Sequence, residues 1–246
     1  MDSKDIIEES SPRHNFQYLD LVTIAFTVVL VLSNFASSAK IIDWGLSIGS
    51  IPLAFDAGTV FFPFAYILGD VLTEVYGYSR ARRVIWIGFG ALLFTFLMFS
   101  LVRVLPGEPL WQETVGQGAF EAVLGGISFG GIILASISGY LIGSFANSLI
   151  MAVMKKLTSG KHLWMRTIGS TIVGEFLDSA VFIAIASFTS VFPWELFWSL
   201  TLTNYLFKVA IEVVFTPVTY WITKKLKKIE DVDVYSDLTD LNPLSF

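Results

Sequence analysis

Acidic side chains recur at helical spacing inside the most apolar stretches of this sequence. Asp70 and Glu74 are four residues apart. Glu175 and Asp178 are three residues apart, and Glu212 lies in a third apolar stretch. Residues at these spacings share one face of a helix. An ionisable group costs about 2.5–3.5 kcal/mol when a helix enters a bilayer, so such groups usually face a protein interior or a water path. The pattern therefore indicates a polar site within a membrane domain.

The residues that accompany these acids indicate the kind of ligand. Acidic residues outnumber basic ones within the apolar stretches, which favours a ligand that is cationic or rich in hydrogen-bond donors. Aromatic side chains nearby could stack on a planar ring. We expect Glu175 and Asp178 to face this ligand. The neighbours that we expect come from the other apolar stretches: Asn34, Phe61, Tyr66, Asn204, Lys208 and Glu212.

Structural roles compete with a binding role at some of these positions. Lys208 and Glu212 fit an internal ion pair as well as a ligand site, although Lys preceding Glu is the weaker order for such a pair. Glu175 and Asp178 have no basic residue near them in the sequence. A binding role is therefore favoured for Glu175 and Asp178.

The acids at the end of the second apolar stretch do have basic neighbours. Arg82 and Arg83 follow them closely, so a purely structural ion pair is as compatible with the sequence as a function. We interpret Asp70 and Glu74 as part of a cytoplasmic gate. In this interpretation Arg82 or Arg83 holds the two acids when the gate closes.

Composition places the chain among polytopic membrane proteins. Of its 246 residues, 54% are hydrophobic and only 15% are charged, whereas a soluble domain has about 25% charged residues. The charges gather between long apolar blocks. The sequence predicts an all-α fold with a polar N-terminal tail at 1–16, a transmembrane transport domain at 17–226 and an acidic cytoplasmic tail at 227–246.

Six segments are long enough for a bilayer-crossing helix, which needs roughly 20 mostly apolar residues. They are Leu19–Ser38, Pro52–Glu74, Val84–Val102, Ile132–Met154, Ile168–Val191 and Leu196–Ile222. The glycine-rich run 125–131, ahead of the fourth segment, could be a re-entrant or tilted lead-in. Gly139 and Gly143 are four residues apart, a spacing that favours close approach of helix backbones in lipid.

The distribution of basic residues predicts the orientation. If the N-terminus is cytoplasmic, 13 of the 16 Lys and Arg residues fall on the cytoplasmic side. Only Lys40 and Arg103 fall on the outer side, and Lys208 lies within the sixth segment. Because cytoplasmic loops carry the excess of Lys and Arg, both termini are expected to be cytoplasmic.

Missing residue types and motifs exclude several classes of function. Without cysteine the chain has no disulfide, thiol nucleophile or cysteine metal site. His14 and His162 lie outside the six segments, and the sequence has neither an H-E-x-x-H motif nor a P-loop. Asp70 and Asp178 could form an aspartyl dyad, but ILGD lacks the G-x-G-D pattern of intramembrane aspartyl proteases. We expect a small-molecule transporter in the lipid bilayer, with no cofactor and no nucleic-acid partner, and we leave a homodimer open.

Three stretches of the sequence resemble one transporter family. They are NFASSAKI at 34–41, FFPFAYILGDVLTEVYGYSRARRVIWIGF at 61–89 and LWMRTIGSTIVGEFLDS at 163–179. Over about residues 17–225 the chain is similar to the YhhQ, or vitamin-uptake-transporter, family. Its members are bacterial and archaeal inner-membrane transporters of queuosine precursors.

This resemblance implies uptake of a 7-deazaguanine used to make the tRNA nucleoside queuosine: 7-cyano-7-deazaguanine, 7-aminomethyl-7-deazaguanine or queuine. The family also resembles the six-helix substrate-binding subunits of energy-coupling-factor vitamin transporters, which leaves open whether the chain works alone or with an ATPase module. For such a ligand, Asp178 would accept hydrogen bonds from the ring N–H and amino groups. Phe61 or Tyr66 would cover the ring.

Overall fold

Helices that could cross a membrane make up most of this computed structural model. It describes residues 6–8, 15–48, 51–125, 130–190, 193–236 and 241–245. Within these ranges six helical segments are long and apolar enough to span a bilayer, which confirms the all-α polytopic class. The spanning helices are α1 (Leu19–Ala39), α2 (Phe62–Tyr76, preceded by the 3-10 turn η1, Ala57–Phe61), α3 (Tyr78–Val104), α6 (Gly131–Leu157), α7 (Leu163–Phe188) and α8 (Phe197–Ile229).

The second spanning helix begins later than the sequence predicted. Strand β2 (Ile41–Ile48) pairs in antiparallel fashion with β3 (Ile51–Asp56), so the expected start of this span at Pro52 is wrong. The hairpin takes apolar residues that hydropathy alone assigned to the membrane. Helix α2 begins at Phe62, and Pro63 fits its first turn because an N–H there would have no helical acceptor.

Gly77 separates α2 from α3. Its φ of 88° is in the left-handed region, which glycine adopts without the steric cost of a Cβ. The helix α2 therefore stops at Tyr76, and the chain restarts as α3 in a new direction. Arg82 and Arg83 consequently belong to a different helix from Asp70 and Glu74.

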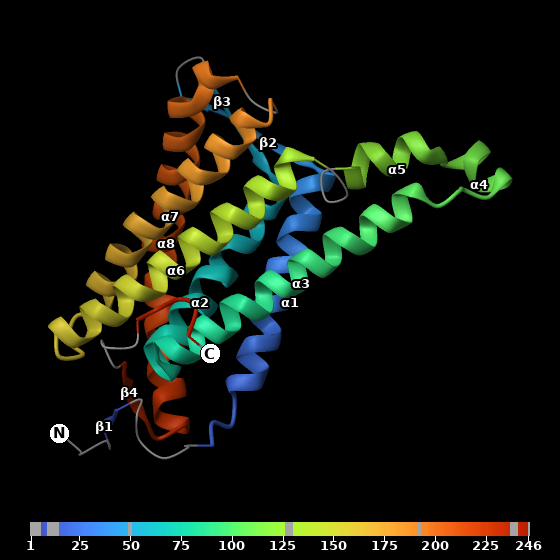
Figure 1. Ribbon diagram of the computed structural model, residues 1–246. Helices are drawn as coiled ribbons and strands as arrows, with labels where there is room; N and C mark the ends of the chain where they lie inside the picture. Colours follow the sequence, from blue (N-terminus) through green and yellow to red (C-terminus); the bar gives the residue numbers. More distant parts are fainter. Residues whose placement is uncertain are drawn as a thin grey trace.

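Shorter elements lie at the two ends of the bundle. Helices α4 (Pro109–Thr114) and α5 (Gly116–Leu124) follow α3 and project away from the spanning helices (Figure 1). The turn η3 (Trp194–Leu196) precedes α8, which contains an internal proline, Pro217.

The expected re-entrant or tilted lead-in at 125–131 falls largely on residues 126–129, which lie outside the described ranges.

Small residues bring α6 and α7 together, as the four-residue glycine spacing predicted. A Cβ added to Gly139 would lie 2.8 Å from the Asp178 Oδ1 atom. One added to Gly143 would lie 2.6 Å from the Asp178 Cβ and 3.0 Å from the Gly174 carbonyl oxygen. The backbones of the two helices can approach this closely only because these positions lack side chains. The contact fixes where Asp178 lies.

Gly143→Ala should therefore weaken the α6–α7 contact. Forcing an extra methyl into a packed interior costs about 1–3 kcal/mol, so we expect a lower thermal-unfolding temperature for the purified protein in detergent. Gly90→Ala is the matched control, because a Cβ added to Gly90 would have no heavy atom of the described residues within 4 Å, apart from its chain neighbours and its own helix backbone. Equal unfolding temperatures for the two variants would contradict the tight contact.

The two ends of the chain meet at one end of the bundle. Strand β1 (Ile6–Glu8) pairs in parallel with β4 (Asp233–Tyr235), far from the β2–β3 hairpin (Figure 1). Glu230 accepts hydrogen bonds from the backbone N–H groups of Gln17 at 2.8 Å and Tyr18 at 2.9 Å. Because α8 runs to Ile229, it continues past the expected domain boundary at residue 226. We call the end of the bundle that holds β1, β4 and the C-terminal end of α8, with Lys227 and Lys228, the basic end.

The orientation of the bundle can be tested directly because the chain has no native cysteine. Ser159, in the turn between α6 and α7, and Glu113, on α4, are both exposed. In right-side-out spheroplasts, an impermeant maleimide should label Glu113→Cys and leave Ser159→Cys unlabelled until the membrane is opened, because the basic end is expected to be cytoplasmic. The reverse labelling would overturn the N-in, C-in orientation.

Candidate functional site

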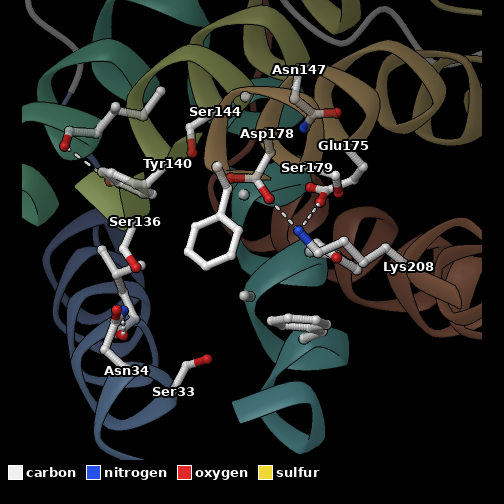
Figure 2. A pocket seen from close by; sticks show the side chains of 18 of the residues that line it. Ser33, Asn34, Ser136, Tyr140, Ser144, Asn147, Glu175, Asp178, Ser179 and Lys208 are labelled. Carbon is white, nitrogen blue, oxygen red and sulfur yellow. Dashed lines mark hydrogen bonds and ion pairs between the residues drawn. The ribbon is translucent and has the colours of Figure 1, made fainter. Parts of the chain in front are cut away.

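A cavity of about 590 Å³ lies among the spanning helices, within the usual size range of small-molecule sites. Residues from all six spanning helices, α1, α2, α3, α6, α7 and α8, line it, and Figure 2 shows most of its polar side chains. Ten of its polar lining residues are Ser33, Asn34, Ser136, Tyr140, Ser144, Asn147, Glu175, Asp178, Ser179 and Lys208. A mostly apolar bundle thus encloses a space with many hydrogen-bonding groups.

One lysine joins the two acids that the sequence singled out. The Nζ of Lys208 lies 3.0 Å from the Glu175 carboxylate and also forms an ion pair with Asp178 (Figure 2). Glu175 and Asp178 share a face of α7, and α8 packs beside α7. Of the two alternatives that the sequence left open for Lys208, the internal ion pair with Glu212 is therefore not the one formed. Two carboxylates and one ammonium leave a net negative charge at this wall of the cavity when all three are ionised.

Aromatic rings line the cavity beside these charges. Phe62 and Tyr66 on α2 have ring centroids 5.8 Å apart, and Phe182 comes from α7. The Lys208 ammonium lies 5.2 Å from the Phe62 ring centroid, within cation–π range. Phe61, which we expected to cover a ligand, is not among the lining residues. One residue along a helix is a rotation of about 100°, so Phe62 faces the cavity instead.

The remaining binding candidates divide into two groups. Asn34 and Asn204 line the cavity as expected, and the Asn34 amide also donates to the Leu30 carbonyl at 2.9 Å. Glu212 lies outside the lining and is only 1% exposed. Asp70 is equally buried and accepts a 3.4 Å hydrogen bond from Asn147. Glu212 and Asp70 therefore form a separate buried site.

A polar stripe on α6 was missed by the sequence analysis. Ser136, Tyr140, Ser144 and Ser148 line the cavity at successive steps of four residues. This spacing places them on one face of α6. The signal was present in the sequence as hydroxyl groups at regular spacing in a span without charge.

Glu74 is held at the basic end by partners other than those expected. Arg166 on α7 donates to both carboxylate oxygens of Glu74, at 2.9 and 3.1 Å. Lys227 on α8 lies 2.6 Å from Oε1, and Lys155 on α6 donates to the Glu74 carbonyl at 2.7 Å. Glu74 and Arg166 are each 1% exposed. Such a desolvated cluster ties α2 to three other helices.

Arg82 and Arg83 do not hold this acid. Arg82 donates to the Asn242 carbonyl at 2.7 Å, and Arg83 is exposed. The predicted pairing of Asp70 and Glu74 with Arg82 or Arg83 is therefore wrong for both acids, since Asp70 accepts from Asn147. The turn at Gly77 directs the two arginines along α3, away from the face of α2 that bears the acids.

The C-terminal segment contributes a second acid to this cluster. Asp233 lies 2.7 Å from both Lys155 and Lys227, and Lys155 also donates to the Val234 carbonyl at 2.7 Å. Burial alone would raise the pKa of Asp233, but the two lysines hold it below its ordinary value of 3.8. Its stabilising contribution is therefore present above that value and is lost only as the pH falls through the lowered pKa. We call Glu74, Lys155, Arg166, Lys227 and Asp233 the basic-end network.

Glu74→Gln should destabilise the protein strongly. Removing one partner of a buried ion pair costs about 3–5 kcal/mol, because the remaining charges stay buried without compensation. We expect a clear drop in the thermal-unfolding temperature in detergent. Glu121→Gln removes the exposed Arg103–Glu121 pair, whose atoms are 3.2 Å apart, and should leave that temperature nearly unchanged. If Glu74→Gln changes the thermal-unfolding temperature as little as Glu121→Gln does, the network adds no stability.

Six apolar helices around a charged cavity define a polytopic membrane transporter, and comparison with known proteins gives its family. Residues 56–222, more than half of the chain, match the family described as "Putative vitamin uptake transporter". The chain belongs to this family, whose members are transporters and not enzymes. Within the described residues no group of three His, Asp or Glu side chains could hold a metal ion.

Curated relatives carry a more specific name. The chain is 29% identical over 174 residues to the "Probable queuosine precursor transporter" of Bacillus subtilis, which covers 70% of this chain and 71% of the relative. It is 29% identical over 161 residues to the "Queuosine precursor transporter" of Escherichia coli K12, covering 64% of this chain and 67% of the relative. No solved structure matches this chain.

Proposed function

We propose that this protein takes up queuosine precursors across a bacterial or archaeal inner membrane. The names of the curated relatives support this class of substrate. The geometric observation that carries the proposal is the cavity wall where two α7 carboxylates lie beside α2 aromatic rings. The substrate would be 7-cyano-7-deazaguanine, 7-aminomethyl-7-deazaguanine or queuine.

The chemistry of the cavity suits a deazaguanine ring. The ring presents adjacent N–H and amino donors, and a carboxylate can accept both in parallel hydrogen bonds. In this proposal Asp178 accepts from that edge, while Glu175 keeps Lys208 paired. Phe62 and Tyr66 offer faces for stacking. The net negative charge also favours the cationic aminomethyl compound.

The basic-end network would act as the cytoplasmic gate in this function. Glu74 stays in the gate as the sequence analysis expected, with Arg166, Lys155 and Lys227 in place of Arg82 and Arg83. To release a substrate on that side, α2 must move relative to α7 and α8. These ion pairs would then break and become hydrated.

The function is tested by uptake of radiolabelled deazaguanines in cells that cannot synthesise them. Expression of the chain should produce saturable uptake, which unlabelled deazaguanine should inhibit and unlabelled biotin should not. Stimulation that requires a co-expressed ATPase module would instead favour the alternative, a substrate-binding subunit of an energy-coupling-factor transporter. Absence of deazaguanine uptake from well-expressed protein would refute the proposal.

Asp178→Asn should weaken binding of 7-cyano-7-deazaguanine to the purified protein roughly 10- to 150-fold. A hydrogen bond to a charged group contributes about 1.5–3 kcal/mol. The Asn side chain has one accepting oxygen, and its NH₂ group donates, so it cannot accept the two parallel hydrogen bonds that a carboxylate accepts. Equilibrium dialysis with labelled ligand measures the change. Glu195→Gln, an exposed acid outside the cavity, is the control and should bind as the unmodified chain does. Unchanged affinity in Asp178→Asn would place the ligand elsewhere.

A further inference from the structure

Asp70 on α2 and Glu212 on α8 form a buried acidic site next to the cavity. Each residue is 1% exposed. One carboxylate oxygen of Asp70 and both oxygens of Glu212 are fully buried and have no hydrogen-bond partner among the described residues. From the part of the chain that the structure describes, the other Asp70 oxygen accepts one hydrogen bond, from Asn147 at 3.4 Å. The two acids lie close enough to interact electrostatically.

Among the described residues, no cation is left to compensate two negative charges at this pair. Arg166, which interacts electrostatically with Asp70, is already engaged by both oxygens of Glu74. Lys208, four residues before Glu212 on α8, is paired with Glu175 and Asp178. The titratable groups that face the pair are Tyr66 and Glu74 from α2 and Glu175 and Arg166 from α7, while α6 contributes the uncharged Asn147. An unpaired buried carboxylate is costly enough that it takes up a proton instead. Two adjacent carboxylates in a dry site cannot both stay ionised.

The pair lies between the cavity and the basic-end network. Glu212 follows Lys208 by four residues on α8, and Asp70 precedes Glu74 by four residues on α2. Four residues of helix rise about 6 Å, so the pair occupies one layer between the two charged clusters. Asn147 connects the layers, because it lines the cavity and donates to Asp70. An event in the cavity can therefore reach the acids through one side chain.

We propose that the Asp70–Glu212 pair carries protons that enter with the substrate. In the closed state an O–H bond forms on one of these carboxyl groups, with the proton drawn from the outer solution. When the basic-end network opens, water reaches the pair, the O–H bond breaks, and the proton passes to that water on the cytoplasmic side. The bundle then closes on the cytoplasmic side, and the carboxylate left behind takes its next proton from the outer solution when the cavity opens to that side. Inward movement of protons thus drives inward movement of substrate, which rests on the proposed function.

Proteoliposomes that contain the full chain test the coupling. The membrane potential is clamped with valinomycin and equal potassium on both sides, and labelled 7-cyano-7-deazaguanine is added outside. For one proton per neutral substrate, a gradient of one pH unit, acid outside, should support up to about tenfold accumulation. Substrate addition should also acidify the lumen, as read by an internal pH dye. Accumulation that ignores the pH gradient would overturn the proposal.

Two variants that preserve size localise the effect. Asp70→Asn and Glu212→Gln should lose accumulation driven by the pH gradient, yet they should still exchange internal unlabelled for external labelled substrate. Glu195→Gln should accumulate substrate as the unmodified chain does. If one acid variant elutes as an aggregate in size-exclusion chromatography, the test is made with the other variant. Gradient-driven accumulation that survives in a well-folded acid variant would exclude that residue as the proton carrier.

The exchange assay separates the two levels of inference. If the unmodified chain exchanges substrate but its accumulation does not depend on the pH gradient, the transport function is retained and proton coupling is rejected. Absence of both binding and exchange in the unmodified chain would reject the transport function, and the coupling proposal would fall with it.

Discussion

The cost of placing charge in a medium of low dielectric constant governs how this protein is built. Each ionisable side chain within the spanning helices must find an opposite charge, a hydrogen-bond donor or a proton. Lys208 meets this requirement for Glu175 and Asp178 in the cavity, and Arg166 with two lysines meets it for Glu74. Moving α2, α6, α7 or α8 would separate at least one of these pairs, so the pairs hold these four helices in place. The charged clusters thus determine helix packing as much as the apolar surfaces do.

Local sequence signals were sufficient for the class of fold and for part of the cavity. Helical periodicity placed Glu175 and Asp178 on one face of α7, and composition identified six spanning helices. The hairpin of β2 and β3 could not be recognised, because an apolar strand and an apolar helix end have the same composition. The conformation of Gly77 decides where α2 stops, and hydropathy does not register it.

The partners of the charged residues could not be obtained in the same way. Lys208 is 30 residues from Asp178, and Arg166 is 92 residues from Glu74. Such contacts depend on which helices pack together, whereas spacing reports only on residues within one helix. Arg82 is only eight residues from Glu74 along the chain, but helix packing brings Arg166 to the acid instead. The acidic C-terminal segment likewise gave no signal that Asp233 would join two lysines.

Pro217 gives α8 a point of bending between its charged residues. Proline has no N–H to donate to the Val213 carbonyl, and its ring crowds the preceding turn, so a helix can flex there at lower cost than elsewhere. Lys208 and Glu212 lie before this point, and Lys227 lies after it. The second half of α8 can therefore move while the first half stays packed against the cavity. In this way α8 can keep Lys208 in place in the cavity and withdraw Lys227 from the basic-end network.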